Sequence, residues 1–196
     1  MNMKPHTFQQ FLRNLTSISE EAITEIEASG IRKSVKASAI FFSASGPFSK
    51  LLFLEKGLVR SYRVIDGKDI TFYFFTVGEF AVDYESFLKE SGISLFFDAL
   101  VVCDYLEFSK PTIEALYDLF PVFERVGRIM AEQAYLSATS RVKELQAESL
   151  QDRYLKLLAR NPELFQQIPQ YHIASYLGVK PQSLSRVRAK LTGKIY

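Results

Sequence analysis

The stretch GLVRSYRVIDGKDITFYFFTVGEF, residues 57–80, contains two runs of β-type residues around the dipeptide Asp66-Gly67. Glycine tolerates the positive φ that a tight two-residue turn requires, so this stretch predicts a β-hairpin. The surrounding segment, from about Val35 to Phe108, is rich in Val, Ile, Phe, Tyr and Thr and is punctuated by glycines. Several short strands at this spacing predict a small antiparallel β-barrel or jelly roll.

The composition is that of a globular protein without the usual enzyme motifs. Of the 196 residues 47% are hydrophobic, enough for one good core or for a mid-sized domain with a small second one. The one cysteine excludes an intrachain disulfide, and the two histidines lie far apart in sequence. Nucleophile-elbow, P-loop and dinucleotide-binding motifs are missing. We therefore expect neither enzymatic activity nor a bound metal or cofactor.

The first residues lack the apolar segment of a signal peptide, and the apolar runs of the chain are too short for a bilayer. A cytoplasmic protein without a membrane partner is expected from this pattern.

Helices are predicted on both sides of the β-rich segment, which gives an α+β protein. Residues 8–29 show apolar residues at helical spacing, with Ser19 as an N-cap and Gly30 as a stop signal. From Pro121 a helix of about 25 residues follows. An apolar stripe runs along it, made of Val122, Phe123, Val126, Ile129, Met130 and Leu136, and the candidate interface residues are Val122, Val126, Ile129, Met130 and Leu136. The stripe fits a core face or a dimer interface, and the length of the helix favours the interface.

The basic character of the chain is concentrated in its last part. After Glu163 the sequence has five basic residues and no acidic one. A helix starting at Pro181 separates an apolar side from a polar side. Leu184, Val187 and Leu191 share the apolar side, and Gln182, Ser185, Arg186 and Ala189 share the opposite one. A short helix with Ile173, Ala174 and Leu177 inward precedes it, and Gly178 lies in the turn between them. This pattern indicates a helix-turn-helix, whereas a solvated surface helix is the alternative.

The stretch IPQYHIASYLGVKPQSLSRVRAKL, residues 168–191, resembles the DNA-binding end of the Crp/Fnr superfamily of bacterial transcription regulators. Residues 51–80 resemble the second half of its cyclic-nucleotide-binding barrel, and the helix from Pro121 resembles its dimerisation helix. The resemblance implies a sensor domain over residues 1–120, a dimerisation helix and linker over 121–148, and a helix-turn-helix domain over 149–196.

The resemblance also implies which residues contact DNA. The base-facing positions are Pro181, Gln182, Ser185 and Arg186. The expected phosphate contacts are Gln170, Lys180, Ser183, Arg188 and Lys190. Arg can pair with guanine, Gln with adenine, and Lys neutralises phosphate. The implied partners are double-stranded DNA with an inverted-repeat operator and a second copy of the chain. An unidentified small-molecule effector and RNA polymerase are further candidates.

Two departures from the family pattern concern the effector and the wing. The candidate effector pocket comprises Phe74, Gly78, Glu79, Phe80, Ile93 and Ser94. Family members that bind a cyclic nucleotide hold its phosphate with an arginine followed by a small hydroxyl residue, and Ile93-Ser94 stands at that place here, so cyclic AMP is not expected to bind. The sequence around the helix-turn-helix is too short for a full β-wing. The competing hypothesis is a cupin-like barrel module that binds a small molecule or a protein and no DNA.

Overall fold

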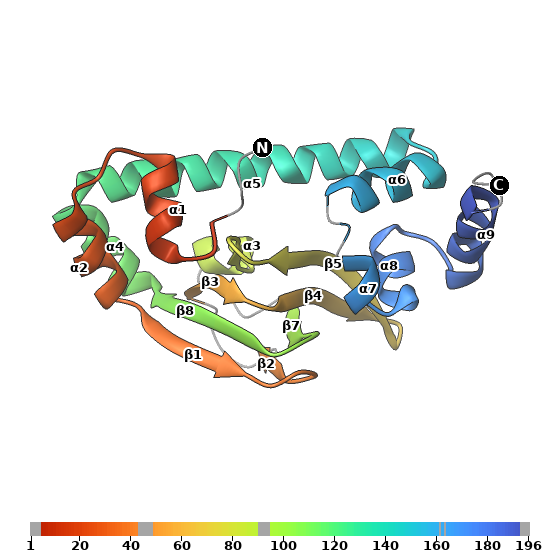
Figure 1. Cartoon of the computed structure of the whole chain (residues 1–196), viewed down its shortest axis with the longest axis horizontal. Helices are drawn as coiled ribbons and strands as arrows, with labels where there is room; N and C mark the ends of the chain where they lie inside the picture. The colour runs from red at the N-terminus through yellow and green to blue at the C-terminus, as the bar shows by residue number, and fades with distance from the viewer. Residues whose placement is uncertain (1–4, 43–48, 90–94, 161, 163, 193–196) are drawn as a thin grey trace. The chain divides into compact units, whose positions relative to one another are not determined.

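The computed structural model describes residues 5–42, 49–89, 95–160, 162 and 164–192 (Figure 1). The chain divides into two compact units. The first, called here the sheet unit, comprises Met1–Tyr62 and Tyr73–Glu132. The second, called here the helical unit, comprises Arg63–Phe72, which is the tip of the hairpin, together with Gln133–Tyr196. The domain boundaries expected from the sequence stay a prediction.

Eight strands lie in two antiparallel sheets within the described residues. One sheet has the order β1-β8-β3-β6, formed by Ile31–Val35, Cys103–Ser109, Lys50–Lys56 and Phe80–Ala81. The other has the order β2-β7-β4-β5, formed by Ile40–Phe42, Phe96–Ala99, Leu58–Ile65 and Lys68–Thr76. The predicted antiparallel β-domain is confirmed, but its strands form two open sheets and not a closed barrel, because each sheet ends in strands without a further neighbour.

The hairpin predicted at Asp66-Gly67 joins β4 and β5. Asp66 and Gly67 have φ values of 50° and 71°. Positive φ at both central residues is the signature of the type I′ turn, whose twist matches that of the flanking strands. The two-residue signal in the sequence therefore predicted this connection correctly.

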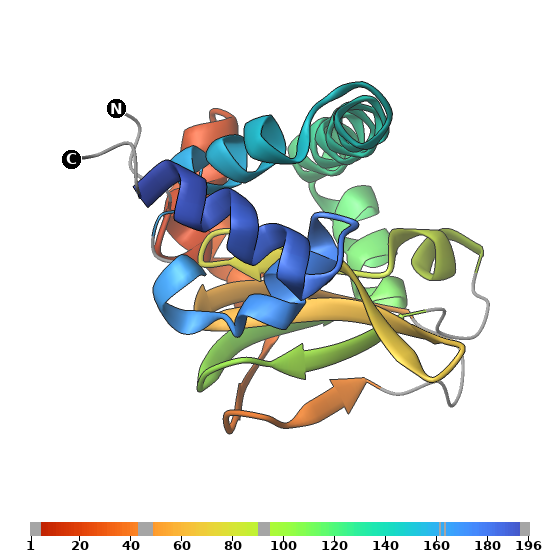
Figure 2. The same cartoon turned by 90° about the vertical axis from the view of Figure 1, so that its right-hand side faces the viewer.

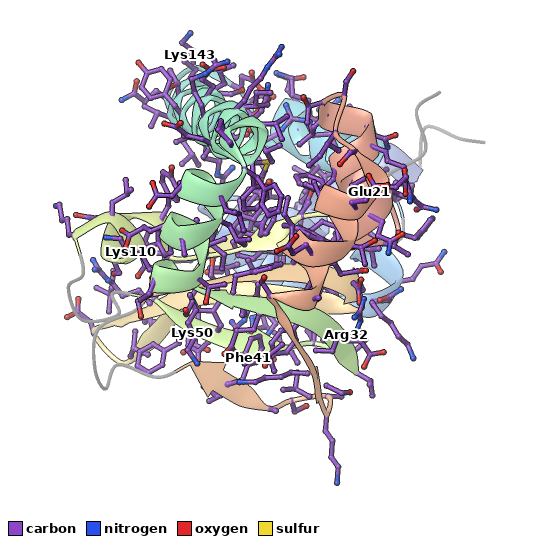
Figure 3. All side chains as sticks on the ribbon, turned by 90° about the vertical axis from the view of Figure 1, so that its left-hand side faces the viewer. Glu21, Arg32, Phe41, Lys50, Lys110 and Lys143 are labelled. Carbon is purple, nitrogen blue, oxygen red and sulfur yellow. The ribbon has the colours of Figure 1, made fainter. Side chains whose placement is uncertain are left out.

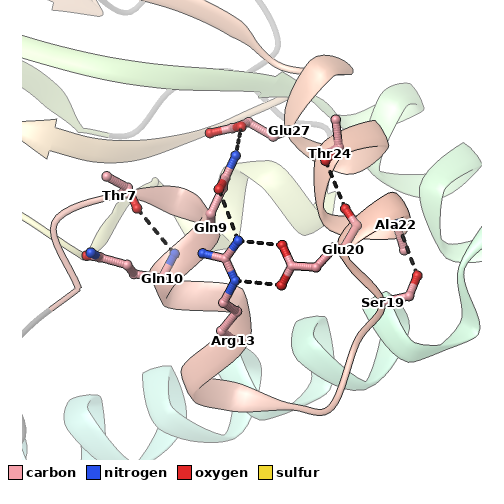
Figure 4. Close-up of polar contacts among 9 residues, drawn as sticks. All are labelled: Thr7, Gln9, Gln10, Arg13, Ser19, Glu20, Ala22, Thr24 and Glu27. Atoms are coloured by element: carbon pink, nitrogen blue, oxygen red, sulfur yellow. Dashed lines mark hydrogen bonds and ion pairs between the residues drawn. The ribbon is translucent and has the colours of Figure 1, made fainter.

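Among the described residues, four helices belong wholly to the sheet unit: α1 (Phe8–Leu15), α2 (Glu20–Ala28), α3 (Tyr84–Lys89) and α4 (Lys110–Leu119). The region predicted as helical over 8–29 is thus two helices. Thr7 and Ser19 cap them, accepting from the amides of Gln10 and Ala22 at 3.2 Å each, so the N-cap predicted at Ser19 is confirmed. Arg13 joins the two helices by a bidentate pair with Glu20 (Figure 4).

Strands β3 and β8 are packed on both faces. Phe53, Leu106 and Phe108 point into one core, with apolar residues of α1, α2, α4 and the start of α5. Leu52, Leu54, Cys103 and Tyr105 point into a second core, with residues of β4, β5 and β7. Phe41, labelled among the strands in Figure 3, stacks on Tyr105 with ring centroids 5.8 Å apart. The sheet unit therefore has three layers: helices, one sheet, then the other sheet.

The long helix predicted from Pro121 is confirmed as α5, Pro121–Ala147. The helical unit contains its second half, followed by α6 (Leu150–Arg160), α7 (Leu164–Gln167), α8 (Gln170–Tyr176) and α9 (Pro181–Thr192). Figure 2 shows α9 beside α8. No strand follows Ser109 within the described residues, and the reduced wing stays a prediction.

Candidate nucleic-acid interface

The turn between α8 and α9 is built on Gly178. Its φ is 71°, and its amide donates to the Ser175 carbonyl at 3.0 Å. The Val179 amide donates to the Ala174 carbonyl at 3.0 Å, which closes the end of α8. Only glycine adopts this left-handed conformation without steric cost, so the turn is fixed by one residue.

Helix α9 has one buried side and one exposed side. Leu184 is fully buried, as are Ile173, Ala174 and Leu177 of the preceding segment. These four inward positions predicted from helical periodicity are confirmed, whereas Val187 and Leu191, predicted on the same side of α9 as Leu184, are half-buried. All four predicted base-facing residues, Pro181, Gln182, Ser185 and Arg186, are exposed. Of the predicted phosphate contacts, Gln170, Lys180 and Lys190 are exposed, whereas Ser183 and Arg188 are half-buried.

The exposed side of α9 is electropositive. Within the described residues, the three exposed cations Lys180, Arg186 and Lys190 have no acidic side chain within ion-pair distance. Two acidic residues of the helical unit form ion pairs with cations outside α9. Glu144 pairs with Arg160 at 2.9 Å, and Glu148 pairs with Lys156. Lys180, Arg186 and Lys190 are therefore available to an anionic partner.

The end of α8 is held by the second half of α5. The Arg141 guanidinium lies 4.0 Å above the centroid of the Tyr176 ring and donates to the Tyr176 carbonyl. Burial lowers the pKa of Arg141 from its ordinary value, although nearby Tyr176 and Glu144 favour its charged form. Leu145 of α5 lies against Gly178, where a Cβ would come within 3.3 Å of it. The helix-turn-helix formed by α8 and α9 is thus attached to the second half of α5.

The tip of the β4–β5 hairpin also contacts α8 within the helical unit. The Ser175 hydroxyl accepts from the Thr71 amide at 2.9 Å and donates to the Asp69 carbonyl at 3.0 Å. Sequence reasoning missed this contact. A serine between an alanine and a tyrosine in a short helix carries no signal for it.

The candidate effector pocket is dispersed. Phe74 is buried, and the Glu79 carboxylate accepts from the Thr76 amide at 2.9 Å, next to Gly78 with its φ of 84°. Phe80 packs against Phe8, Phe11 and Phe53 on the helical side of its sheet, so it does not face the space between the sheets. The predicted Ile93 and Ser94 lie outside the described residues.

An unexpected arginine lies beside the pocket segment. Arg60 of β4 faces Asp98 of β7, and the two side chains form two hydrogen bonds of 3.0 and 2.7 Å. The charge of Asp98 is therefore compensated by a buried cation 38 residues away in sequence.

The residues predicted for the dimer interface divide into two groups. Val126 is 2% exposed and packs in the core of its own protomer, and Met130 packs against that core. Val126 is therefore covered within its own protomer, whereas Met130 is half-buried. Val122 and Ile129 are half-buried, and Leu136 is 57% exposed. Three more large apolar residues of α5 are exposed, namely Tyr135, Val142 and Leu145.

Comparison with known proteins finds this architecture at low sequence identity. The chain matches no family model and no curated protein. Its fold is that of Crp/Fnr-type regulators. The regulator CLP of Xanthomonas campestris, described as responsive to cyclic di-GMP, aligns with a TM-score of 0.70 and 18% identity over 90% of this chain and 93% of its own.

Two further solved structures agree. FixK2 of Bradyrhizobium japonicum aligns with a TM-score of 0.72 and 16% identity, covering 84% of this chain and 85% of its own. A protein of Eubacterium rectale described as a transcriptional regulator of the Crp/Fnr family aligns with a TM-score of 0.68 and 15% identity, covering 90% and 85%. None of the helices in the described part of the chain has the length and hydropathy of a membrane span.

Proposed function

We propose that the protein is a DNA-binding transcription regulator that acts as a homodimer, with α9 as the helix that reads the major groove. The observation that carries this proposal is the division of α9 into a buried side at Leu184 and an exposed side with Gln182, Ser185 and Arg186. An exposed, uncompensated polar face on a firmly packed helix is what a base-reading element requires.

The residue types on that face match the chemistry of base edges. Arg186 can donate two hydrogen bonds to guanine O6 and N7, and Gln182 can pair with adenine N6 and N7. Lys180 and Lys190, at the two ends of α9, are placed to neutralise phosphates on either side of the groove. Gln170, at the start of α8, supplies a further candidate contact with the backbone.

The dimer interface is proposed along the exposed apolar side of α5. Ile129 and Leu136 are seven residues apart, which is the repeat of a two-helix interface. A two-fold axis along α5 would present two copies of α9 to successive major grooves, about 34 Å apart. An inverted-repeat operator follows from this symmetry.

The effector is proposed to be a molecule other than cyclic AMP. The family's phosphate-binding arginine is replaced by Ile93, and the guanidinium of Arg60 is already engaged by Asp98. The similarity to regulators and not to enzymes supports a non-enzymatic role. RNA polymerase is proposed as a further partner, as expected for a regulator.

Selection of bound duplexes from a random pool by the purified protein, followed by sequencing, tests the proposal. We expect enrichment of an inverted repeat with half-sites centred about 10 base pairs apart or a multiple of that distance. A pool that stays random after several rounds, with no retention on duplex DNA at low salt, would overturn it. That outcome would favour a binding module without DNA, the competing hypothesis from the sequence.

A further inference from the structure

The Ser175 hydroxyl makes the two hydrogen bonds with β5 that the backbone of a further strand would otherwise make. Strand β5 stands at the end of its sheet in the order β2-β7-β4-β5. In an extended strand the carbonyl of one residue and the amide two residues later point to the same side. The Asp69 carbonyl and the Thr71 amide are such a pair, and Ser175 satisfies both.

The contact with the hairpin tip holds α8 from a second side, in addition to the contact of α8 with α5. Ser175 and Tyr176 are adjacent, so their side chains project about 100° apart around the helix. Ser175 binds the hairpin tip, whereas the Tyr176 ring and carbonyl bind Arg141 of α5. All these residues belong to the helical unit. The last turn of α8 is therefore held between the hairpin tip and α5, immediately before the turn that leads to α9.

We propose that Ser175 is a positioning residue for the DNA-reading helix, which it sets in place by docking α8 on the outer edge of β5. This inference rests on the proposed function. A dimer that reads an inverted repeat must hold two copies of α9 at one separation, and a dimer whose readers are held loosely loses conformational freedom when binding fixes that separation. A single half-site makes no such demand, because only one reader is engaged.

The predicted phenotype is therefore specific. Ser175→Ala removes both hydrogen bonds and should weaken binding to the preferred inverted repeat about tenfold, the equivalent of losing two ordinary hydrogen bonds. Affinity for an isolated half-site should not change. Across duplexes whose half-sites are moved apart or together by one base pair, the variant should discriminate less than the wild type. Ser175→Thr keeps the hydroxyl and should restore wild-type behaviour.

The hairpin side offers a matched pair of variants. Thr71→Pro deletes the donating amide, which points away from β4 and so is not required by the sheet. Thr71→Val keeps the amide and removes only the side-chain hydroxyl, a buried group without a hydrogen-bond partner among the described residues. Thr71→Pro should reproduce the effect of Ser175→Ala, and Thr71→Val should behave as the wild type.

Docking can be tested without DNA by measuring hydrogen exchange of the Thr71 amide, which Ser175→Ala should accelerate about tenfold. Unchanged exchange would overturn the docking contact, whatever the DNA results. Faster exchange with unchanged or tighter binding to the inverted repeat would overturn the positioning role while leaving the proposed function intact. If the wild type binds neither the inverted repeat nor the half-site, the proposed function and the positioning role fall together.

Discussion

The Arg60 guanidinium and the Asp98 carboxylate face each other across β4 and β7 and form a two-point ion pair, with Arg60 also lying 4.0 Å above the Tyr62 ring. The side chain of Arg60 is only 3% exposed and that of Asp98 15%. Removing one partner leaves the other as a desolvated charge, so Asp98→Asn or Arg60→Ala should lower the free energy of unfolding by about 3–5 kcal/mol.

Urea denaturation measures this loss, and replacement of both residues by apolar ones of similar volume is the matched control. The double variant should recover most of the lost stability, because no charge stays buried. Equal stability of Asp98→Asn and the wild type would show that the pair contributes nothing.

Glutamate substitutions at two apolar residues of α5, Leu136 and Val126, should have different outcomes. Leu136→Glu introduces charge at a residue that is 57% exposed in the protomer, so it should give folded monomers. Val126→Glu places charge in the protomer's own core and should unfold the sheet unit. Sedimentation velocity and far-ultraviolet circular dichroism distinguish the two. A wild type that sediments as a monomer at micromolar concentration would rule out the interface.

Arg186 and Lys190 should differ in how they contribute to DNA affinity. Arg186→Ala should cost about 1–3 kcal/mol on the preferred duplex and relax the choice of base at one position in each half-site. Lys190→Ala should weaken all duplexes alike and reduce the salt dependence by about one to two ions per dimer. Titrations of specific and scrambled duplexes over a salt series measure both. An equal loss on both duplexes for Arg186→Ala would make Arg186 a phosphate contact.

Cyclic AMP and cyclic GMP should not bind with measurable affinity. In the proposed assignment Ile93 stands in place of the family's phosphate-binding arginine, and Arg60 is neutralised by Asp98. A cyclic phosphate would lose its hydration without gaining a charged, two-point partner. Isothermal calorimetry at millimolar nucleotide should show no saturable heat, and a micromolar dissociation constant would require another cation in the pocket.

Glu107 gives the stability of the sheet unit a defined pH dependence. Burial alone raises the pKa of this carboxyl, but hydrogen bonds from Lys50 at 2.9 Å and Lys33 at 3.0 Å more than offset burial and lower it below its ordinary value of 4.5. A depressed pKa stabilises the folded state above pH 4.5, and this contribution is lost as the pH falls through the folded pKa.

Glu107→Gln should therefore be less stable than the wild type at neutral pH and should lose less stability on acidification. Urea midpoints between neutral pH and about pH 3 test this linkage. Glu114→Gln is the control, since that side chain is 62% exposed and should change stability by less than about 0.5 kcal/mol. Parallel pH profiles for Glu107→Gln and the wild type would contradict the assignment.

Features that depend on nearby residues were predictable from the sequence. The Asp66-Gly67 turn, the Ser19 cap and the inward side of α9 at Leu184 each follow from a few consecutive residues or from one helical period. Strand register is different, because nothing local in the sequence pairs Arg60 with Asp98. Which layer of the fold covers the apolar side of a helix is equally non-local. For this reason the sequence predicted Val126 at the dimer interface, whereas the structure places it in the core of its own protomer.

The alternation along β3 has a mechanical consequence. Phe53 contributes to the core beneath the helices, while its neighbours Leu52 and Leu54 contribute to the core between the sheets. One backbone thus forms the common wall of both cores, and the same holds for β8. Any displacement of this wall changes the packing on its two sides at once, so the helical layer and the second sheet cannot loosen independently. A change of packing between the two sheets is therefore transmitted to α1 and α2 by the rigid strands β3 and β8, and not by a chain of mobile side chains.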